Sequence, residues 1–336
     1  MSFAFADGPL FFPVTAYAED GTVDHALTRA HIEAGVDAGP GGVFPACGTG
    51  EFHALSASES VAVARTAVEA VAGRIPVIAG VGGPVGQAIE SARNLQGAGV
   101  DGLLLLPPYL VAATQAGLEA YVAAVASASE LPIIVYHRAT AKFEAATFAR
   151  ILETQPTVVG FKDGIGDVAL AQQIVLGARA VREDVQFFNG LLTAEASQAA
   201  YRAIGIPLYS SAVFAMAPDI ARAFYEAYRD GDDARCDELL TGFFFPLVGL
   251  RDTTPGYAVA LIKAGVRLAG LPVGGVRPPL VDPGEAHTAR LEQLLAAGRS
   301  LPSAGGARMS EGAVSEVAGM PEGAVSASAA SALVSS

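Results

Sequence analysis

The 336-residue sequence has no tryptophan, only two cysteines and few lysines, and its acidic residues outnumber the basic ones. Cys47 and Cys236 fall in different kinds of segment, which argues against a disulfide framework and against a set of zinc ligands. The formal net charge of −13 argues against nucleic acid or an anionic membrane as a partner, because either would repel such a surface. An anionic small molecule is still allowed where a site supplies local hydrogen-bond donors.

Long hydrophobic runs are also missing. No segment reaches the roughly 18 consecutive apolar residues of a membrane-spanning helix. Residues 1–8 have neither a basic region nor a long apolar stretch, so they do not resemble a secretion signal. With 51% hydrophobic residues the composition is that of a globular protein. We therefore expect a cytoplasmic protein that binds a small molecule.

Short apolar runs alternate with longer amphipathic stretches along most of the chain. The runs are apolar on both faces, as the strands of a covered parallel sheet must be. They are 10–15, 42–46, 76–81, 102–106, 133–136, 158–162, 185–189 and 207–211. Helical patterns lie between them, at 56–72, 117–129, 145–154, 168–181 and 193–204, and the first opens with the capping box of Ser56 and Glu59.

Eight such alternations favour an α/β fold with one closed (β/α)8 TIM barrel. The alternative is an open doubly wound sheet, but the first strand lacks the glycine-rich phosphate loop that usually follows it there. Helical patterns at 217–229, 233–248, 255–269 and 284–297 predict a C-terminal helical extension. We expect a barrel over residues 1–230, an extension packed on it over 231–300, and a disordered tail rich in Ala, Ser and Gly over 301–336.

Polar residues collect where the predicted strands end, which is where a barrel carries its chemistry. Lys162 ends the sixth strand, and burial there should lower the pKa of its amine enough to make it a nucleophile for imine formation. Tyr136 ends the fifth strand, where its phenol can pass protons beside an imine. The plainer alternatives are a lysine that marks the strand's exit to solvent and a buried tyrosine with one hydrogen bond.

A glycine-rich loop follows the second strand. Its glycines allow the backbone N–H groups of Gly48 and Thr49 to face a small anion such as a carboxylate, and the Thr49 hydroxyl adds a donor. Simple turn formation is the alternative. Glu51 is expected to close the loop by hydrogen bonding rather than to act as a base.

These motifs together resemble the dihydrodipicolinate synthase and N-acetylneuraminate lyase family of Schiff-base aldolases. The resemblance rests on Phe12-Pro13-Val14-Thr15, on the loop from Gly48 to Glu51, on the strand that ends in Tyr136, and on Gly160-Phe161-Lys162-Asp163-Gly164, and it spans about residues 8–300. It implies that Lys162 forms the imine, that Tyr136 shuttles protons and that Gly48 and Thr49 hold the carboxylate beside the keto carbon. It also implies a homo-oligomer, a dimer or tetramer, that needs no cofactor or metal.

The departures from the synthase pattern point to one branch of this family. Leu110 stands where a dihydrodipicolinate synthase has a second tyrosine, and Ala141 stands where such synthases have an arginine. The segments around Cys47, Tyr136, Asn189 and Ser210 instead look like those of 5-dehydro-4-deoxyglucarate dehydratases. That branch converts a sugar diacid to 2,5-dioxopentanoate with loss of water and carbon dioxide.

This resemblance makes further residues candidates for holding the substrate's hydroxyls and its far carboxylate. They are Asn189, Ser210, Ser211 and Arg138. For Arg138 a salt bridge on the barrel rim is the plainer and favoured alternative. Two other functions stay open. One is a retro-aldolase or dehydratase for another 2-keto-3-deoxy sugar acid, and the other is a binding protein without turnover.

Overall fold

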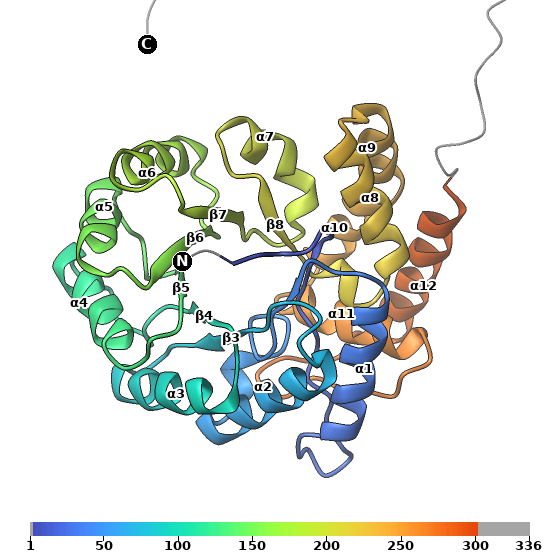
Figure 1. The fold of residues 1–336 in the computed structure, drawn as a ribbon. Coiled ribbons are helices and arrows are strands. Elements are labelled where there is room, and N and C mark those ends of the chain that lie inside the picture. Colours follow the sequence, from blue (N-terminus) through green and yellow to red (C-terminus); the bar gives the residue numbers. More distant parts are fainter. Residues whose placement is uncertain (1–2, 302–336) are drawn as a thin grey trace, which may run out of the picture. The chain divides into compact units, whose positions relative to one another are not determined.

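Eight short parallel strands form a barrel in the computed structural model, which describes residues 3–301 (Figure 1). The order in the sheet is β2-β1-β8-β7-β6-β5-β4-β3, and a parallel bridge between Val43 and Val77 joins its two edges. The predicted barrel is therefore confirmed, and the open doubly wound sheet is excluded. The strands are β1 (Leu10–Phe11), β2 (Gly42–Val43), β3 (Ile78–Val81), β4 (Gly102–Leu105), β5 (Ile133–His137), β6 (Val158–Asp163), β7 (Gln186–Asn189) and β8 (Leu208–Ser211).

The strands are apolar on both faces because both faces are covered. In β4, Leu103 and Leu105 belong to the core between the barrel and its helices, whereas Leu104 points into the barrel interior. The interior core also contains Ile134 of β5 and Phe188 of β7. This alternation is the two-residue period of a strand, with both phases filled by apolar side chains.

Helices follow the strands and surround the barrel (Figure 1). The predicted capping box is present at the start of α2, where Ser56 and Glu59 each accept the other's backbone N–H. The predicted helix at 193–204 is instead a 3-10 turn, Ala194–Ser197, followed by α7. The eight helices are α1 (His25–Asp37), α2 (Ala57–Val71), α3 (Val85–Ala98), α4 (Gln115–Ala126), α5 (Ala145–Thr154), α6 (Val168–Val181), α7 (Gln198–Ala203) and α8 (Pro218–Asp230).

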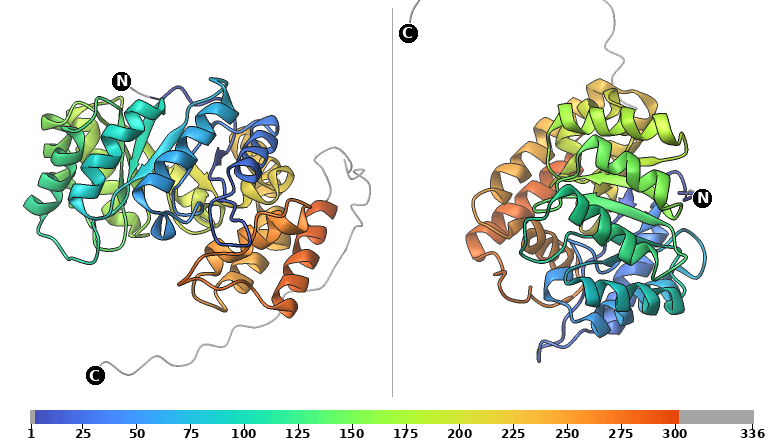
Figure 2. Two further views of the ribbon diagram at one scale, coloured as in Figure 1. Left: turned by 90° about the horizontal axis from the view of Figure 1, so that it is seen from below. Right: turned by 90° about the vertical axis from the view of Figure 1, so that its left-hand side faces the viewer.

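Further helices form the extension, which lies below the barrel in the left-hand view of Figure 2. The prediction of one helix over 233–248 is wrong, because a π-helical segment, Leu240–Phe244, separates two short helices. Pro246 accounts for the change, since it has no N–H for the regular helical bond and its ring crowds the preceding turn. The helices are α9 (Asp233–Leu239), α10 (Phe245–Arg251), α11 (Tyr257–Leu268) and α12 (Glu285–Ser300).

The segment before β1 closes the amino end of the barrel, which the sequence did not predict. Phe3 joins the interior core, and both of its backbone polar groups bond to the Gln186 side chain at 3.0 Å.

The described residues belong to one compact unit, so the division at residue 230 stays a prediction. The predicted tail lies outside the described residues from residue 302 onward.

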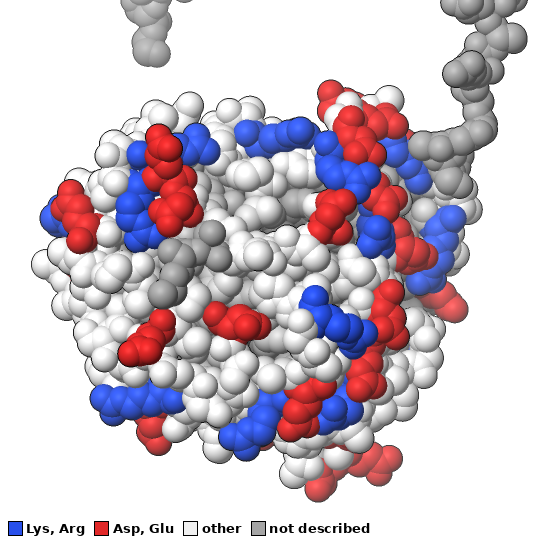
Figure 3. Space-filling model, in the orientation of Figure 1, with Lys and Arg blue, Asp and Glu red and all other residues white. Residues whose placement is uncertain are grey.

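The surface carries both signs of charge. On the face shown in Figure 3, basic and acidic side chains lie next to one another. Arg229, for example, forms ion pairs with both Asp7 and Asp230. Within residues 3–301, no helix combines the length and the apolar character needed to cross a bilayer.

Candidate active site

A cavity of about 420 Å³ lies at the carboxyl ends of the barrel strands. One wall comes from the barrel and the other from the extension, through the apolar side chains of Leu247 on α10 and of Leu261 and Ile262 on α11. The extension is therefore part of the site. Of the residues predicted from the sequence, six line this cavity: Gly48, Thr49, Tyr136, Arg138, Lys162 and Ser210.

Lys162 faces the barrel interior because β6 is irregular. The pairing of β5 with β6 shifts by one residue, so that Ile133 is opposite Val158 but Ile134 is opposite Gly160. In a regular strand Val159 and Lys162 would point to opposite sides. The extra residue brings both inward, which is the usual effect of a β-bulge near a functional site.

The amine of Lys162 lies between two aromatic rings. Its Nζ is 4.1 Å from the ring centroid of Phe12 and 4.6 Å from that of Tyr136, and only 5% of the residue is exposed. Within the described part of the chain, this amine has no carboxylate within ion-pair distance. Burial lowers the pKa of Lys162 from 10.5 to about 7; the Cys47 thiol opposes this shift and the charge of Arg138 adds to it. A large share of neutral, nucleophilic amine is thus present near pH 7.

Tyr136 is the neighbour of Lys162 in the sheet, since the two are paired in the register of β5 and β6. Its hydroxyl donates to the carbonyl of Gly190 at 2.8 Å and accepts from Nη1 of Arg138 at 2.9 Å. Burial raises the pKa of Tyr136, and the nearby positive charge of Arg138 opposes that rise. The phenol is therefore protonated at neutral pH, with a cation at hand to stabilise it if it loses its proton.

Two glycines make room for these side chains. A Cβ at Gly190 would lie 2.5 Å from Cε of Lys162, and a Cβ at Gly164 would lie 2.8 Å from the ring of Tyr136. Both distances are too short for a real contact. The positions that follow β6 and β7 are therefore restricted to glycine because a larger residue would collide with Tyr136 or Lys162.

The loop after β2 presents unused donors to the cavity. Gly48 and Thr49 line it, and among residues 3–301 neither their backbone N–H groups nor the Thr49 hydroxyl has a hydrogen-bond partner. Neighbouring groups fix the loop, through Thr15 Oγ1 donating to the Gly50 carbonyl at 2.7 Å and the Phe52 N–H donating to the Cys47 carbonyl at 3.0 Å. Free N–H groups on a fixed loop form a binding place for a small anion.

Arg138 is the second cation of the cavity. The one hydrogen bond of its guanidinium within the described chain goes to Tyr136, and no described carboxylate pairs with it, so the predicted alternative of a rim salt bridge is not found. A guanidinium has five N–H donors, so four of them are left for a ligand. Arg138 can therefore bind a carboxylate with two hydrogen bonds.

The structure does not bring Asn189 and Ser211 to the cavity. The Asn189 amide donates to the Ala194 carbonyl at 3.1 Å and to Ser197 Oγ at 3.0 Å, which anchors the turn before α7. Ser211 donates to the buried Glu195 at 2.6 Å. The expectation that both bind substrate is corrected because successive strand residues point to opposite sides, and these two face the helices. Ser210 does line the cavity, and its hydroxyl donates to the Asn189 carbonyl at 3.3 Å.

Glu51 points away from the cavity. Its carboxylate accepts from Nζ of Lys263 on α11 and from the backbone N–H of Arg277, both at 2.8 Å. The expectation that Glu51 closes the loop by hydrogen bonding fits this geometry, although both partners come from the extension and were not anticipated. Among residues 3–301, no group of three or more His, Cys, Asp or Glu side chains is placed to hold a metal ion.

The sequence matches proteins of known family over most of its length. A model of the dihydrodipicolinate synthetase family matches residues 6–298. A protein of Streptomyces coelicolor, named "Probable 5-dehydro-4-deoxyglucarate dehydratase 1", is 52% identical over 303 residues, which cover 90% of this chain and 96% of the relative. A protein of Rhizobium rhizogenes with the same name but for the final number is 44% identical over 294 residues, which cover 87% and 95%.

Solved structures share the fold. A dihydrodipicolinate synthase from Oceanobacillus iheyensis superposes with a TM-score of 0.79 at 25% identity, covering 89% of this chain and 98% of the other. An E. coli prophage protein of the dihydrodipicolinic acid synthase family, solved in complex with pyruvate, superposes with a TM-score of 0.77 at 27% identity, covering 87% and 98%.

Proposed function

Because the chain belongs to the dihydrodipicolinate synthetase family, we propose that it is a 5-dehydro-4-deoxyglucarate dehydratase, a decarboxylating lyase. The substrate is a six-carbon diacid with a ketone at C5, and the products are 2,5-dioxopentanoate, carbon dioxide and water. The observation that carries the proposal within the site is Lys162, a buried amine whose pKa falls to about 7 beside Tyr136. The names of relatives that are about half identical to this chain supply the substrate.

In this proposal the Lys162 amine attacks the C5 ketone, which loses its oxygen as water and becomes a protonated imine. The carboxylate next to that carbon binds the free donors of Gly48 and Thr49. The imine draws electrons from C4, which loses a proton to solvent. The C3 hydroxyl then leaves as water with a proton from Tyr136, which regains a proton from solvent. The result is a C3–C4 double bond conjugated with the imine.

Dehydration precedes decarboxylation in this scheme. The product keeps the carboxylate beside the ketone, so the lost carbon dioxide is C1, which is bonded to C2. Electrons from the C1–C2 bond reach the imine only through the new C3–C4 double bond. The resulting enamine carries an enol at C2. Protonation at carbon, conversion of the enol to the aldehyde and hydrolysis of the imine then release 2,5-dioxopentanoate and the free amine. Arg138 and Ser210 are the cavity residues that we assign to the far end of the substrate.

Two residues argue against dihydrodipicolinate synthesis. Leu110 is 76% exposed, and neither it nor the buried Ala141 lines the cavity. The second tyrosine and the arginine expected of a synthase are thus absent from these two positions. Assembly into a homo-oligomer, which the family resemblance implies, stays a prediction.

The test is to incubate the pure protein with 5-dehydro-4-deoxyglucarate and to measure all carbon products. The proposal predicts equal amounts of carbon dioxide and 2,5-dioxopentanoate, and no products from a Lys162→Ala variant that folds normally. Release of pyruvate without carbon dioxide would instead identify a retro-aldolase and overturn the assignment. No turnover, together with tight binding of the diacid, would indicate a binding protein.

A further inference from the structure

The loop that carries Gly48 and Thr49 ends in a carboxylate that is completely buried. Glu51 and Lys263 form an ion pair at 2.8 Å in which neither side chain has any exposed surface. Glu51 also has a left-handed backbone conformation, with a φ of 60°. A non-glycine residue keeps such a conformation only where its surroundings hold it in place.

Both partners of Glu51 come from far along the chain. Lys263 stands on α11, 212 residues away, and the backbone N–H of Arg277 is 226 residues away. The Tyr17 ring contacts both cationic groups, with its centroid 3.8 Å from Lys263 Nζ and 4.2 Å from the guanidinium carbon of Arg277. We call Tyr17, Glu51, Lys263 and Arg277 the loop clamp.

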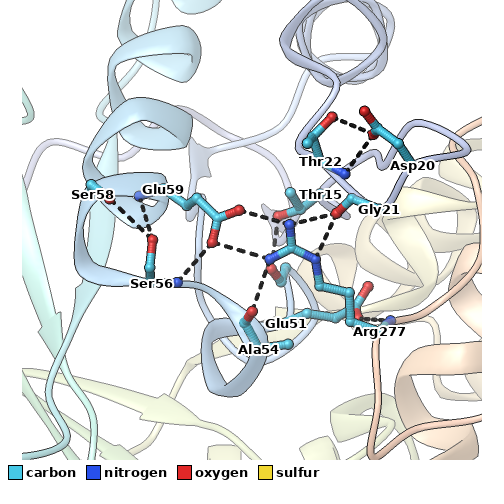
Figure 4. A network of polar contacts seen from close by, with 11 residues as sticks. Thr15, Asp20, Gly21, Thr22, Glu51, Ala54, Ser56, Ser58, Glu59 and Arg277 are labelled. Atoms are coloured by element: carbon cyan, nitrogen blue, oxygen red, sulfur yellow. Dashed lines mark hydrogen bonds and ion pairs between the residues drawn. The ribbon is translucent and has the colours of Figure 1, made fainter.

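The Arg277 guanidinium extends the loop clamp to both sides of the loop (Figure 4). It donates to the carbonyl of Gly21 at 2.7 Å, to that of Ala54 at 2.9 Å, and to both carboxylate oxygens of Glu59 at 2.7 and 3.1 Å. Ala54 and Glu59 flank the start of α2, directly after the loop. One arginine of the extension thus joins the segments before and after Gly48 and Thr49.

Stability alone is a weak explanation for this arrangement. A buried ion pair gains little over well-packed apolar residues, because both charges lose their hydration. The whole sequence has three lysines, at positions 142, 162 and 263, and the two that are buried both lie at this end of the barrel. A buried charge whose hydrogen bonds are all satisfied does, however, fix the position of the group that it contacts.

We infer that Lys263 and Arg277 are positioning residues for keto-acid recognition: they hold Glu51 so that the N–H groups of Gly48 and Thr49 point at the substrate carboxylate. This inference rests on the proposed function, since it assigns a purpose to the carboxylate-binding loop. It also gives the extension a part in the reaction. The extension holds the loop from outside while Thr15 holds it from the barrel side, through its bond to Gly50.

Pyruvate and acetone together test the inference, because they differ in the carboxylate alone. Both form an imine with a reactive lysine that borohydride reduces to a stable adduct, and mass spectrometry gives the concentration of each that half-saturates labelling. In Lys263→Met, the half-saturating pyruvate concentration should rise about tenfold or more, whereas the value for acetone should change less than about twofold. Arg277→Gln keeps the backbone N–H that bonds to Glu51. Its half-saturating pyruvate concentration should therefore rise less, about threefold, again with little change for acetone.

Arg299→Gln is the matched control, because it breaks an exposed ion pair with Asp219 within the helices α8 and α12 and touches no part of the loop clamp. Its pyruvate-to-acetone ratio should equal that of the parent. If Lys263→Met folds poorly, Arg277→Gln alone decides. The inference is wrong if a folded clamp variant has the parent's ratio of half-saturating pyruvate to acetone concentrations, or if both concentrations rise by the same factor. Either result leaves the proposed function standing. A parent protein in which neither pyruvate nor 5-dehydro-4-deoxyglucarate labels Lys162 refutes the proposed function, and the positioning role with it.

Discussion

Replacing Lys162 by methionine should stabilise the folded protein while it abolishes turnover. Methionine keeps an unbranched side chain of similar length but carries no charge, so the packing between Phe12 and Tyr136 is retained. Burial lowers the pKa of Lys162 from 10.5 to about 7, which means that folding disfavours the charged amine. At pH 7 this shift corresponds to about 4 kcal/mol of lost stability, on the scale of 1.36 kcal/mol for each pKa unit.

The pH dependence gives the sign of this effect. Below pH 7 the amine is protonated in both states and the full penalty is present. Between pH 7 and 10.5 the unfolded chain binds the proton and the folded chain does not, so stability increases with pH. At about pH 9.5 most of the penalty is gone and about 1 kcal/mol remains.

Urea titrations of both proteins at equal concentration measure this difference. Lys162→Met should have the larger free energy of unfolding at pH 7, by up to about 4 kcal/mol, and its advantage should shrink by about 3 kcal/mol at about pH 9.5. A Lys142→Met variant is the control, because that lysine is not buried. A Lys162→Met protein that is less stable than the parent at both pH values would refute the claim of an uncompensated buried amine.

Three further substitutions test the other groups of the site. Tyr136→Phe should lower kcat by about 10²- to 10⁴-fold with little change in the half-saturating pyruvate concentration, and a change in binding alone would contradict its role in proton transfer. Arg138→Gln should raise KM for the diacid about tenfold or more, and an unchanged KM in steady-state assays would exclude it as a carboxylate ligand. Gly190→Ala should slow labelling of Lys162 by pyruvate and borohydride, because the added Cβ would lie 2.5 Å from Cε of Lys162, and an unchanged labelling rate would show that the lysine has another free position.

The alternation of apolar runs and helical patterns was sufficient to predict the barrel. The strands are covered on both faces, so their composition alone indicates them. All eight appear where they were expected, although six are shorter than predicted, β1 and β2 most of all. Local irregularities were not predictable in the same way. The bulge in β6 depends on strand pairing that no residue pattern displays, and Pro246 marks a break in the helix expected over 233–248 without revealing that a π-helical segment forms there.

The site was predicted best where one residue at a strand end carries the chemistry. Lys162 and Tyr136 stood out because they end neighbouring predicted strands, in motifs that resemble the family, and because the sequence has only three lysines. Both line the cavity. Asn189 and Ser211 were misassigned because strand ends alone do not reveal which way a side chain points. The ion pair of Glu51 with Lys263 of the extension could not be predicted, because no sequence pattern indicates which residues more than 200 positions apart are in contact.

Reduction with borohydride in the presence of 5-dehydro-4-deoxyglucarate, followed by peptide mapping, tests the imine most directly. With three lysines in the chain, the modified position can be identified without ambiguity. We predict one added mass, located on the peptide that contains Lys162 and absent when the diacid is omitted. Turnover of the diacid without any adduct at Lys162, or an adduct on Lys142 or Lys263 instead, would contradict the account.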